Sequence, residues 1–178
     1  MLSRRALGAL IPGFVMGFGA GALVGAAPVA AQGGLPAPSG PAVLTLKGRI
    51  GVRNAGEEAR LDRAMLAALP QGRFSGETPW TKGRVTFTGP LAAAVLDLVQ
   101  ANGTMLKVTA LNDYAAEVPV DDLRRHAVIL ATHRDGAEMA VRDKGPIWII
   151  YPMDRVPSLR TAVVYNRSVW QVRDIEVM

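Results

Sequence analysis

Two polar stretches that interrupt strand-like apolar runs carry the side chains best suited to chemistry. Asp113 and Tyr114 follow one such run, and Arg142 and Lys144 come just before the apolar run 147–152. A carboxylate beside a phenol at a strand end can contact a ligand, and a closely spaced basic pair can bind an anion. A polar turn and a solvated charged run explain the same residues without a ligand, so both interpretations stay open.

Three common kinds of catalytic site find no support in the sequence. His126 and His133 have no cysteine or carboxylate cluster at ligand spacing, which favours ordinary surface histidines over a metal pair. Asp121 and Asp122 are adjacent, so their side chains diverge on a helix, which favours helix capping over a shared proton. No serine lies in the G-x-S-x-G pattern of many serine hydrolases.

The apolar spacing predicts short helices placed unevenly among strands. A helix capped by Asp62 ends before Pro70, an amphipathic helix follows Leu91, and a brief helix covers 120–125. Strands are predicted at 43–48, 106–111, 127–132, 147–151 and 168–177. This arrangement indicates an α+β domain with a mixed β-sheet.

The order of several short motifs resembles the sulfite-oxidase-fold, molybdopterin-binding oxidoreductase family. The motifs are 88–91 with the helix after it, the turn 112–114, a helix after Pro119, a G-x-P strand at 145–152 and a closing segment at 167–177. Each motif is short, so the specificity of the resemblance comes from their order.

The resemblance implies a single sulfite-oxidase-like domain at 43–178 with a cofactor cleft. It places Asp113 and Tyr114 at the mouth of that cleft. It also makes Arg142, Lys144 and Arg167 candidate cofactor-binding residues of the cleft.

Three departures from the family pattern concern the cofactor. Active members hold molybdenum through a cysteine thiolate, whereas this chain has no cysteine, and the corresponding stretch offers only the oxygen donors Ser75, Glu77 and Thr78. The family's glycine-rich loop is replaced by 153–157, where an acidic side chain would repel a phosphate. Trp170 replaces the second basic residue of the closing motif. Together these departures predict a retained scaffold without its original metal chemistry.

The tryptophans suggest another use for the cleft. Trp80, Trp148 and Trp170 can simply fill the core. Alternatively, Trp80 and Trp170 line the vacated cleft and turn it into a small aromatic-walled pocket.

The amino terminus predicts export. Arg4 and Arg5 precede a glycine-rich apolar run that ends in small residues, the pattern of a signal peptide at 1–31. A membrane anchor is the alternative, but the many glycines favour cleavage, with no stable membrane span afterwards. Residues 32–42 are rich in glycine, proline and alanine and predict a flexible leader. The expected location is therefore periplasmic or secreted.

Composition limits the possible partners. Removal of the signal peptide leaves 147 of 178 residues, enough for one domain with a core, and an excess of only three positive charges. Such an excess indicates solubility and does not indicate nucleic-acid binding.

The sequence therefore predicts an exported domain that binds a small ligand or an envelope protein partner through the former cofactor cleft, with no catalytic role and no cofactor expected. The alternative, from the family resemblance, is a molybdopterin-dependent oxidoreductase with an oxygen ligand from Ser75, Glu77 or Thr78.

Overall fold

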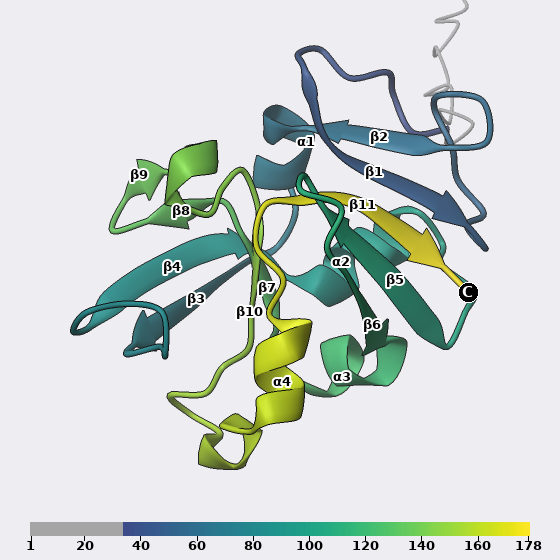
Figure 1. Cartoon of the computed structure of the whole chain (residues 1–178). Helices are drawn as coiled ribbons and strands as arrows, with labels where there is room; N and C mark the ends of the chain where they lie inside the picture. Colours follow the sequence, from purple (N-terminus) through teal and green to yellow (C-terminus); the bar gives the residue numbers. More distant parts are fainter. Residues whose placement is uncertain (1–33) are drawn as a thin grey trace, which may run out of the picture. The chain divides into compact units, whose positions relative to one another are not determined.

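The computed structural model describes residues 34–178, which form two sheets joined by a central strand pair (Figure 1). The strands are β1 Ala42–Gly48, β2 Ala59–Asp62, β3 Gln71–Gly76, β4 Val85–Pro90, β5 Met105–Ala110, β6 Ala115–Pro119, β7 Ile129–Ala131, β8 His133–Arg134, β9 Ala137–Glu138, β10 Trp148–Ile150 and β11 Val172–Val177. The helices are α1 Arg63–Ala67, α2 Ala92–Leu98, α3 Val120–Arg125 and α4 Ala162–Arg167, with short 3-10 turns at Val141–Asp143 and Pro157–Leu159.

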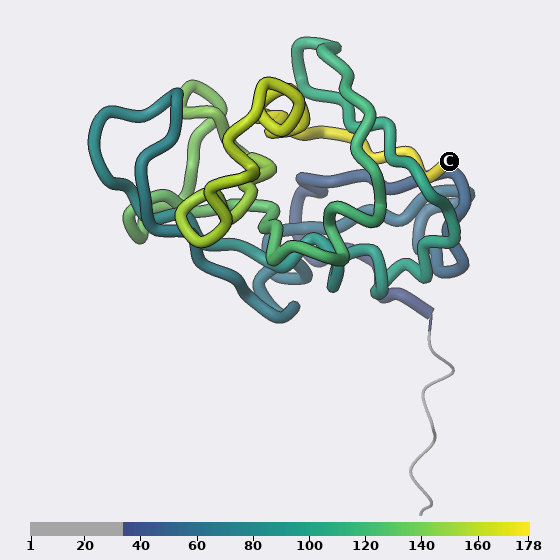
Figure 2. The backbone as a smooth tube through the Cα atoms, turned by 90° about the horizontal axis from the view of Figure 1, so that it is seen from below, coloured from purple at the N-terminus to yellow at the C-terminus, as the bar shows by residue number. Residues whose placement is uncertain are grey.

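The larger sheet has five strands in the order β2-β1-β11-β5-β6. Strands β1 and β11 run parallel and the other pairs are antiparallel, so the predicted mixed sheet of an α+β domain is confirmed. The C-terminal strand ends beside the residue that follows β1, where the Arg49 N–H donates to the Val177 carbonyl oxygen at 2.9 Å (Figure 2). This pairing brings the two ends of the described chain into one sheet.

The second sheet and the central strand pair provide the rest of the core. The second sheet has the order β3-β4-β8-β9, and β7 and β10 pair antiparallel with every residue buried. Because both faces of these two short strands are covered, they are apolar throughout, as their sequences ILA and WII show.

Gly89 allows the two parts of the core to approach closely. A Cβ atom at this position would collide with the carbonyl oxygen of Leu130 in β7. Any residue larger than glycine would therefore push β4 away from β7.

The three helices predicted from the sequence are confirmed. Asp62 caps α1 as expected, with its carboxylate accepting from the Met65 N–H at 2.9 Å. The apolar face of α2 buries Ala92, Val95 and Leu96, and α3 coincides with the predicted 120–125. None of the helices in the described part of the chain is long and apolar enough to cross a membrane.

The last predicted strand is partly wrong. The sequence predicts a strand over 168–177, but the regular strand begins only at Val172. Before it the chain forms α4, whose first turn is capped by the Thr161 hydroxyl, and then only an isolated bridge between Trp170 and Trp148. Strands β3 and β4 are not among the predicted strands: β3 has Phe74 as its one large apolar residue, whereas the alternation of Val85 and Phe87 with threonines in β4 is a strand signal that the prediction overlooked.

The predicted signal peptide, 1–31, lies outside the described residues, as does the start of the predicted leader. The rest of that leader is fixed to the domain, because Asp62 accepts from the Ser39 and Gly40 N–H groups at 2.6 and 2.9 Å. The Asn54 side chain also donates to the Pro36 carbonyl oxygen at 2.8 Å. Ordered structure therefore begins before β1.

Asp62 joins this N-terminal segment to α1. Only 2% of the residue is exposed, and backbone hydrogen bonds from Met65 and Gly40 lower its pKa to about 2. The ionised carboxylate is therefore favoured in the folded state.

We expect Asp62→Ala to lower the midpoint of thermal unfolding at pH 7 by several degrees, because α1 loses its cap and the N-terminal segment its attachment. The folded pKa lies below the ordinary value of 3.8, so this carboxylate stabilises the fold above about pH 4 and loses that effect as the pH falls toward 2.

Thermal unfolding followed by circular dichroism between pH 2 and 7 checks this, with exposed Glu57→Ala as the control. An acid transition that is identical in the natural protein and in Asp62→Ala would contradict it.

Candidate functional site

A pocket of about 340 Å³ lies where four segments of the chain meet. The segments are the β3–β4 loop, the β5–β6 turn, the end of α4, and the residues that lead into β11. Its walls are mostly apolar or aromatic, formed by Pro79, Trp80, Ala110, Asn112, Tyr114, Tyr165, Asn166, Ser168, Val169 and Trp170. A concave, largely apolar site with a few polar groups is typical of small-molecule binding.

Trp80 stands at the centre of an aromatic cluster that forms one side of the pocket. Its ring lies 5.6 Å from that of Tyr165, 5.9 Å from that of Trp170 and 5.6 Å from that of Trp148, measured between centroids. All three contacts are edge-to-face, the arrangement in which aromatic quadrupoles attract. Phe87 extends the cluster into the core, 5.1 Å from Trp148.

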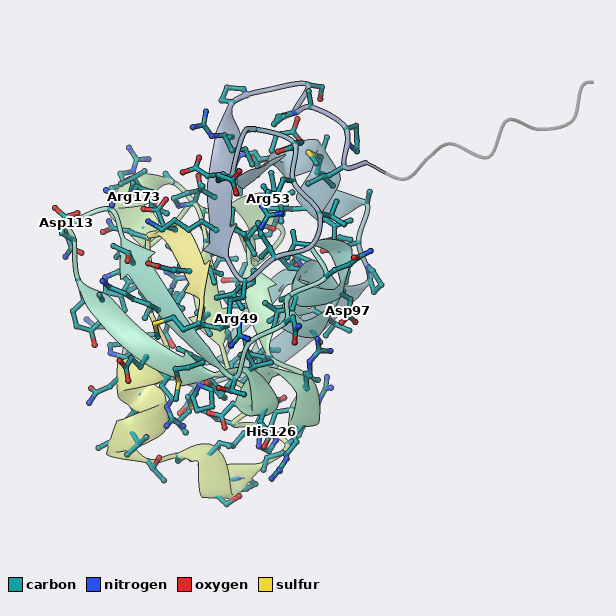
Figure 3. All side chains as sticks on the ribbon, turned by 90° about the vertical axis from the view of Figure 1, so that its right-hand side faces the viewer. Arg49, Arg53, Asp97, Asp113, His126 and Arg173 are labelled. Carbon is teal, nitrogen blue, oxygen red and sulfur yellow. The ribbon has the colours of Figure 1, made fainter. Side chains whose placement is uncertain are left out.

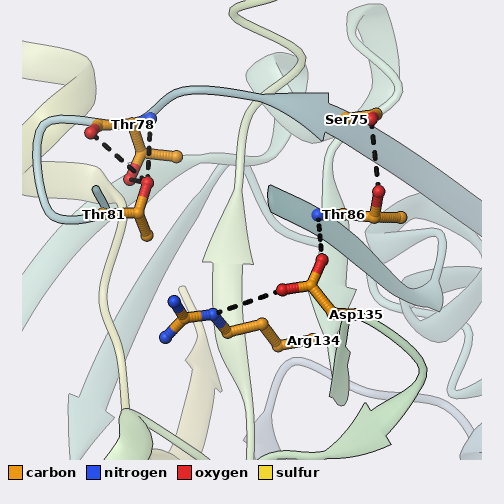
Figure 4. Close-up of polar contacts among 6 residues, drawn as sticks. All are labelled: Ser75, Thr78, Thr81, Thr86, Arg134 and Asp135. Atoms are coloured by element: carbon orange, nitrogen blue, oxygen red, sulfur yellow. Dashed lines mark hydrogen bonds and ion pairs between the residues drawn. The ribbon is translucent and has the colours of Figure 1, made fainter. Parts of the chain in front are cut away.

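Two threonines fix the loop that carries Trp80. The hydroxyls of Thr78 and Thr81 lie 2.9 Å apart (Figure 4). The Trp80 N–H donates to the Thr78 hydroxyl at 3.3 Å. Thr78 is buried, so its hydroxyl fixes this turn from the interior of the protein. The loop is thus tied at its base, and Trp80 is directed toward the cluster.

The opposite walls come from the segment after α4. Trp148 is buried and its Nε1–H donates to the Ser168 carbonyl oxygen at 3.0 Å. The Ser168 hydroxyl in turn donates to the Val164 carbonyl oxygen at 2.9 Å. These two bonds fix the backbone between α4 and Trp170.

The predicted turn between β5 and β6 forms the remaining wall. Asp113 adopts the left-handed conformation at φ 63°, and the Tyr114 N–H donates to the Asn112 side-chain oxygen at 3.2 Å. The Tyr114 hydroxyl then donates to the Asn166 carbonyl oxygen at 3.2 Å. Two segments far apart in the sequence are joined at the edge of the pocket.

The five candidate residues from the sequence have different environments, and of these only Tyr114 lines the pocket. Asp113 points away to Arg173 at 3.4 Å on the surface (Figure 3), and a hydrogen bond from Arg173 to Asp174 raises the pKa of that arginine. Arg142 is exposed beside Asp143.

Lys144 lies just behind the pocket wall. Its Nζ is 4.0 Å from the centroid of the Trp170 ring and 5.5 Å from that of Trp148. Its backbone is left-handed at φ 72°, and its carbonyl oxygen accepts from the Gln171 N–H at 3.0 Å. The lysine is therefore held against the tryptophan by both its side chain and its backbone.

Arg167 belongs to a structural network. Its guanidinium donates to the Asp122 carboxylate at 2.7 Å, and the Tyr151 hydroxyl donates to the same oxygen at 3.3 Å. Burial, and next the charge of Asp122, raise the pKa of Tyr151 far above its usual value. The network links α4 to α3.

Six lining residues are not proposed from the sequence: Pro79, Ala110, Tyr165, Asn166, Ser168 and Val169. Tyr165 and Asn166 lie on α4, which is also not predicted. The signal available was Thr161, a capping residue that precedes a run with apolar spacing.

The donors near the pocket do not fit a molybdenum-bearing pterin. Its lining contains no thiol, no carboxylate and no cation. Of the proposed oxygen donors, Ser75 pairs with the Thr86 hydroxyl at 3.2 Å and Thr78 with Thr81, while Glu77 is exposed (Figure 4). A metal of this kind prefers soft sulfur ligands, and these hydroxyls already have partners.

The loop after β10 also lacks what a pterin phosphate needs. One oxygen of Asp154 is buried and has no hydrogen-bond partner among the described residues. Its other oxygen lies 3.9 Å from the Nε atom of Arg155, so the loop carries an acidic side chain next to a basic one and not the glycine-rich backbone that the resemblance leads us to expect. His126 and His133 do not change this view, because the described residues contain no group of three metal-ligating side chains.

We expect Arg167→Gln to lower the free energy of unfolding by about 1–2 kcal/mol, because a half-buried carboxylate loses its charged partner. Urea unfolding checks the value. Arg125→Gln, which breaks an exposed pair with Asp121, is the control and should cost less than about 0.5 kcal/mol. Equal losses in the two variants would contradict a structural role for Arg167.

No protein-family model and no curated protein matches this sequence. Among solved structures, the fold is similar to the crystal structure of the sulfane dehydrogenase SoxCD from Paracoccus pantotrophus, with a TM-score of 0.51 and 14% sequence identity. The match covers 75% of this chain and 37% of that chain, so this chain spans little more than a third of its neighbour's length. Likeness at this identity concerns the fold alone, and at that level it agrees with the resemblance found in the motifs.

Proposed function

We propose that this protein is an exported binding module that holds a small ligand in the aromatic pocket and performs no molybdenum redox chemistry. The observation that carries the proposal is the pocket itself, because aromatic side chains from several segments form its walls. Hydrogen bonds fix the backbone of Trp80, the hydroxyl of Tyr114 and the backbone before Trp170. By the motif resemblance, the pocket occupies the face where relatives keep their cofactor.

The rigidity of the walls supports a binding role. Trp80, Tyr114 and the backbone before Trp170 are each fixed by contacts within the protein. Ligand binding would therefore cost little conformational entropy in the surrounding side chains, which favours affinity. Tyr114, which lines the pocket, is 47% exposed, so solvent reaches this wall.

A protein partner is the second candidate occupant. Leu111, Tyr114 and Val163 are exposed apolar residues in or next to the segments that line the pocket. Val163 is three residues before Asn166, so the two lie on the same face of α4. A partner would use these residues, whereas a small ligand would use the inner walls.

We expect a neutral planar probe, 2-naphthylmethanol, to bind the full-length gene product after export and purification. Trp80→Ala should weaken that binding at least about tenfold, because the probe loses its central aromatic contact. Isothermal titration calorimetry measures the affinity, and circular dichroism shows whether the variant is folded.

Met178→Ala is the control, since it alters an exposed apolar side chain that follows β11 and no pocket wall. Its affinity for the probe should match that of the natural protein. If the natural protein does not bind the probe, or if folded Trp80→Ala binds it equally well, the small-ligand function is wrong.

We also expect no bound molybdenum in the protein purified from a molybdenum-replete host, because the oxygen donors are engaged or exposed. Elemental analysis by mass spectrometry, together with pterin fluorescence of the denatured protein, provides the measurement. One equivalent of molybdenum with a pterin would establish the alternative enzyme instead.

A further inference from the structure

We infer that the ligand of the aromatic pocket is a planar aromatic molecule with an acidic group, such as an aryl carboxylate, and that Lys144 selects its charge. This inference rests on the proposed binding function and names the class of ligand. The charges near the pocket support the choice of an acidic ligand.

The shape of the pocket alone allows the opposite conclusion. Trp80 meets Trp170 and Tyr165 at steep angles of 68° and 80°, and perpendicular aromatic walls can hold a cation. A quaternary ammonium ligand would therefore be the simplest expectation. The sign of the local electrostatic potential decides between the two.

The pocket lining carries no formal charge, so nearby residues set its potential. Arg142 pairs with Asp143, Arg167 with Asp122, and Arg173 with Asp113 and Asp174. On the β3–β4 loop, Glu77 is exposed together with Lys82 and Arg84. The basic and acidic side chains named here are equal in number, so their charges largely cancel.

Lys144 differs from these residues because its ammonium contacts a ring of the pocket lining. Among the described residues its ammonium has no carboxylate within ion-pair distance, and it rests on the ring of Trp170. A ligand ring stacked on that tryptophan lies about 3.5 Å beyond it, hence within about 8 Å of the ammonium. At that distance a partly buried charge still attracts an anion and repels a cation.

The backbone makes this position a costly one for a lysine. Its φ of 72° is a conformation that glycine adopts without strain. Lysine nevertheless occupies this position, and its side chain lies against Trp170. Its cation–π contacts with Trp170 and Trp148 hold the ammonium beside the pocket wall.

Two amides beside the pocket complete the match. Asn112 and Asn166 line it, and the Asn112 side chain accepts from the Tyr114 N–H through its oxygen, which leaves its own N–H groups for a carboxylate. Neutral amide donors can bind a carboxylate at the mouth while its ring lies between the aromatic walls.

The test uses one ring system with three charges: 2-naphthoate, 2-naphthylmethanol and 2-naphthylmethylammonium. Calorimetry on the full-length exported protein at low salt should show the anion binding about tenfold more tightly than the cation. In Lys144→Met, which keeps the apolar stem, this ratio should fall below about twofold. Lys144→Arg should preserve it, and exposed Lys107→Met is the control that leaves it unchanged.

The outcomes separate the two proposals. If all three probes bind equally, if the cation is preferred, or if Lys144→Met keeps the anion preference, the charge selection is wrong while the pocket remains a binding site. If none of the probes binds, the proposed function fails and the inference fails with it.

Discussion

The pocket depends on the way Trp148 is buried. Its indole fills the space between the central strand pair and the aromatic cluster, and its N–H must find an acceptor there, because an unpaired buried donor is costly. The acceptor is the Ser168 carbonyl oxygen, which fixes the chain between α4 and β11. Trp170 and Val169 therefore face the pocket because a core tryptophan needs a hydrogen bond.

Much of the fold could be predicted because its signals are local. A capping aspartate, apolar residues at helical spacing and a Pro-Val-Asp-Asp start identify α1, α2 and α3. Strand β3 could not, since its pairing with β4 supplies the order that its sequence, with two glycines, lacks, whereas the apolar alternation of β4 was a usable signal. Helix α4 was missed because it is short and its clearest signal, the capping Thr161, was not used.

The site was predictable where an aromatic residue marked it. Trp80, Tyr114 and Trp170 were all proposed from the sequence, and all three line the pocket. Charged residues gave poorer guidance, because a charge in a sequence does not reveal its partner. Arg167 lies in the closing motif, yet its guanidinium is bound to Asp122 from another helix. Such a pairing depends on tertiary structure, so no spacing rule could have found it.

The persistence of an open pocket also has a physical cause. A cleft without a cofactor would normally collapse, because closing it buries apolar surface. Here the walls cannot approach without breaking edge-to-face contacts, each worth about 0.5–1.5 kcal/mol, and the hydrogen bonds of Thr78 and Tyr114. The aromatic rings keep the walls of the pocket apart and leave apolar ring faces exposed between them. The fold can in this way keep a cavity of defined shape with no bound group to hold its walls apart.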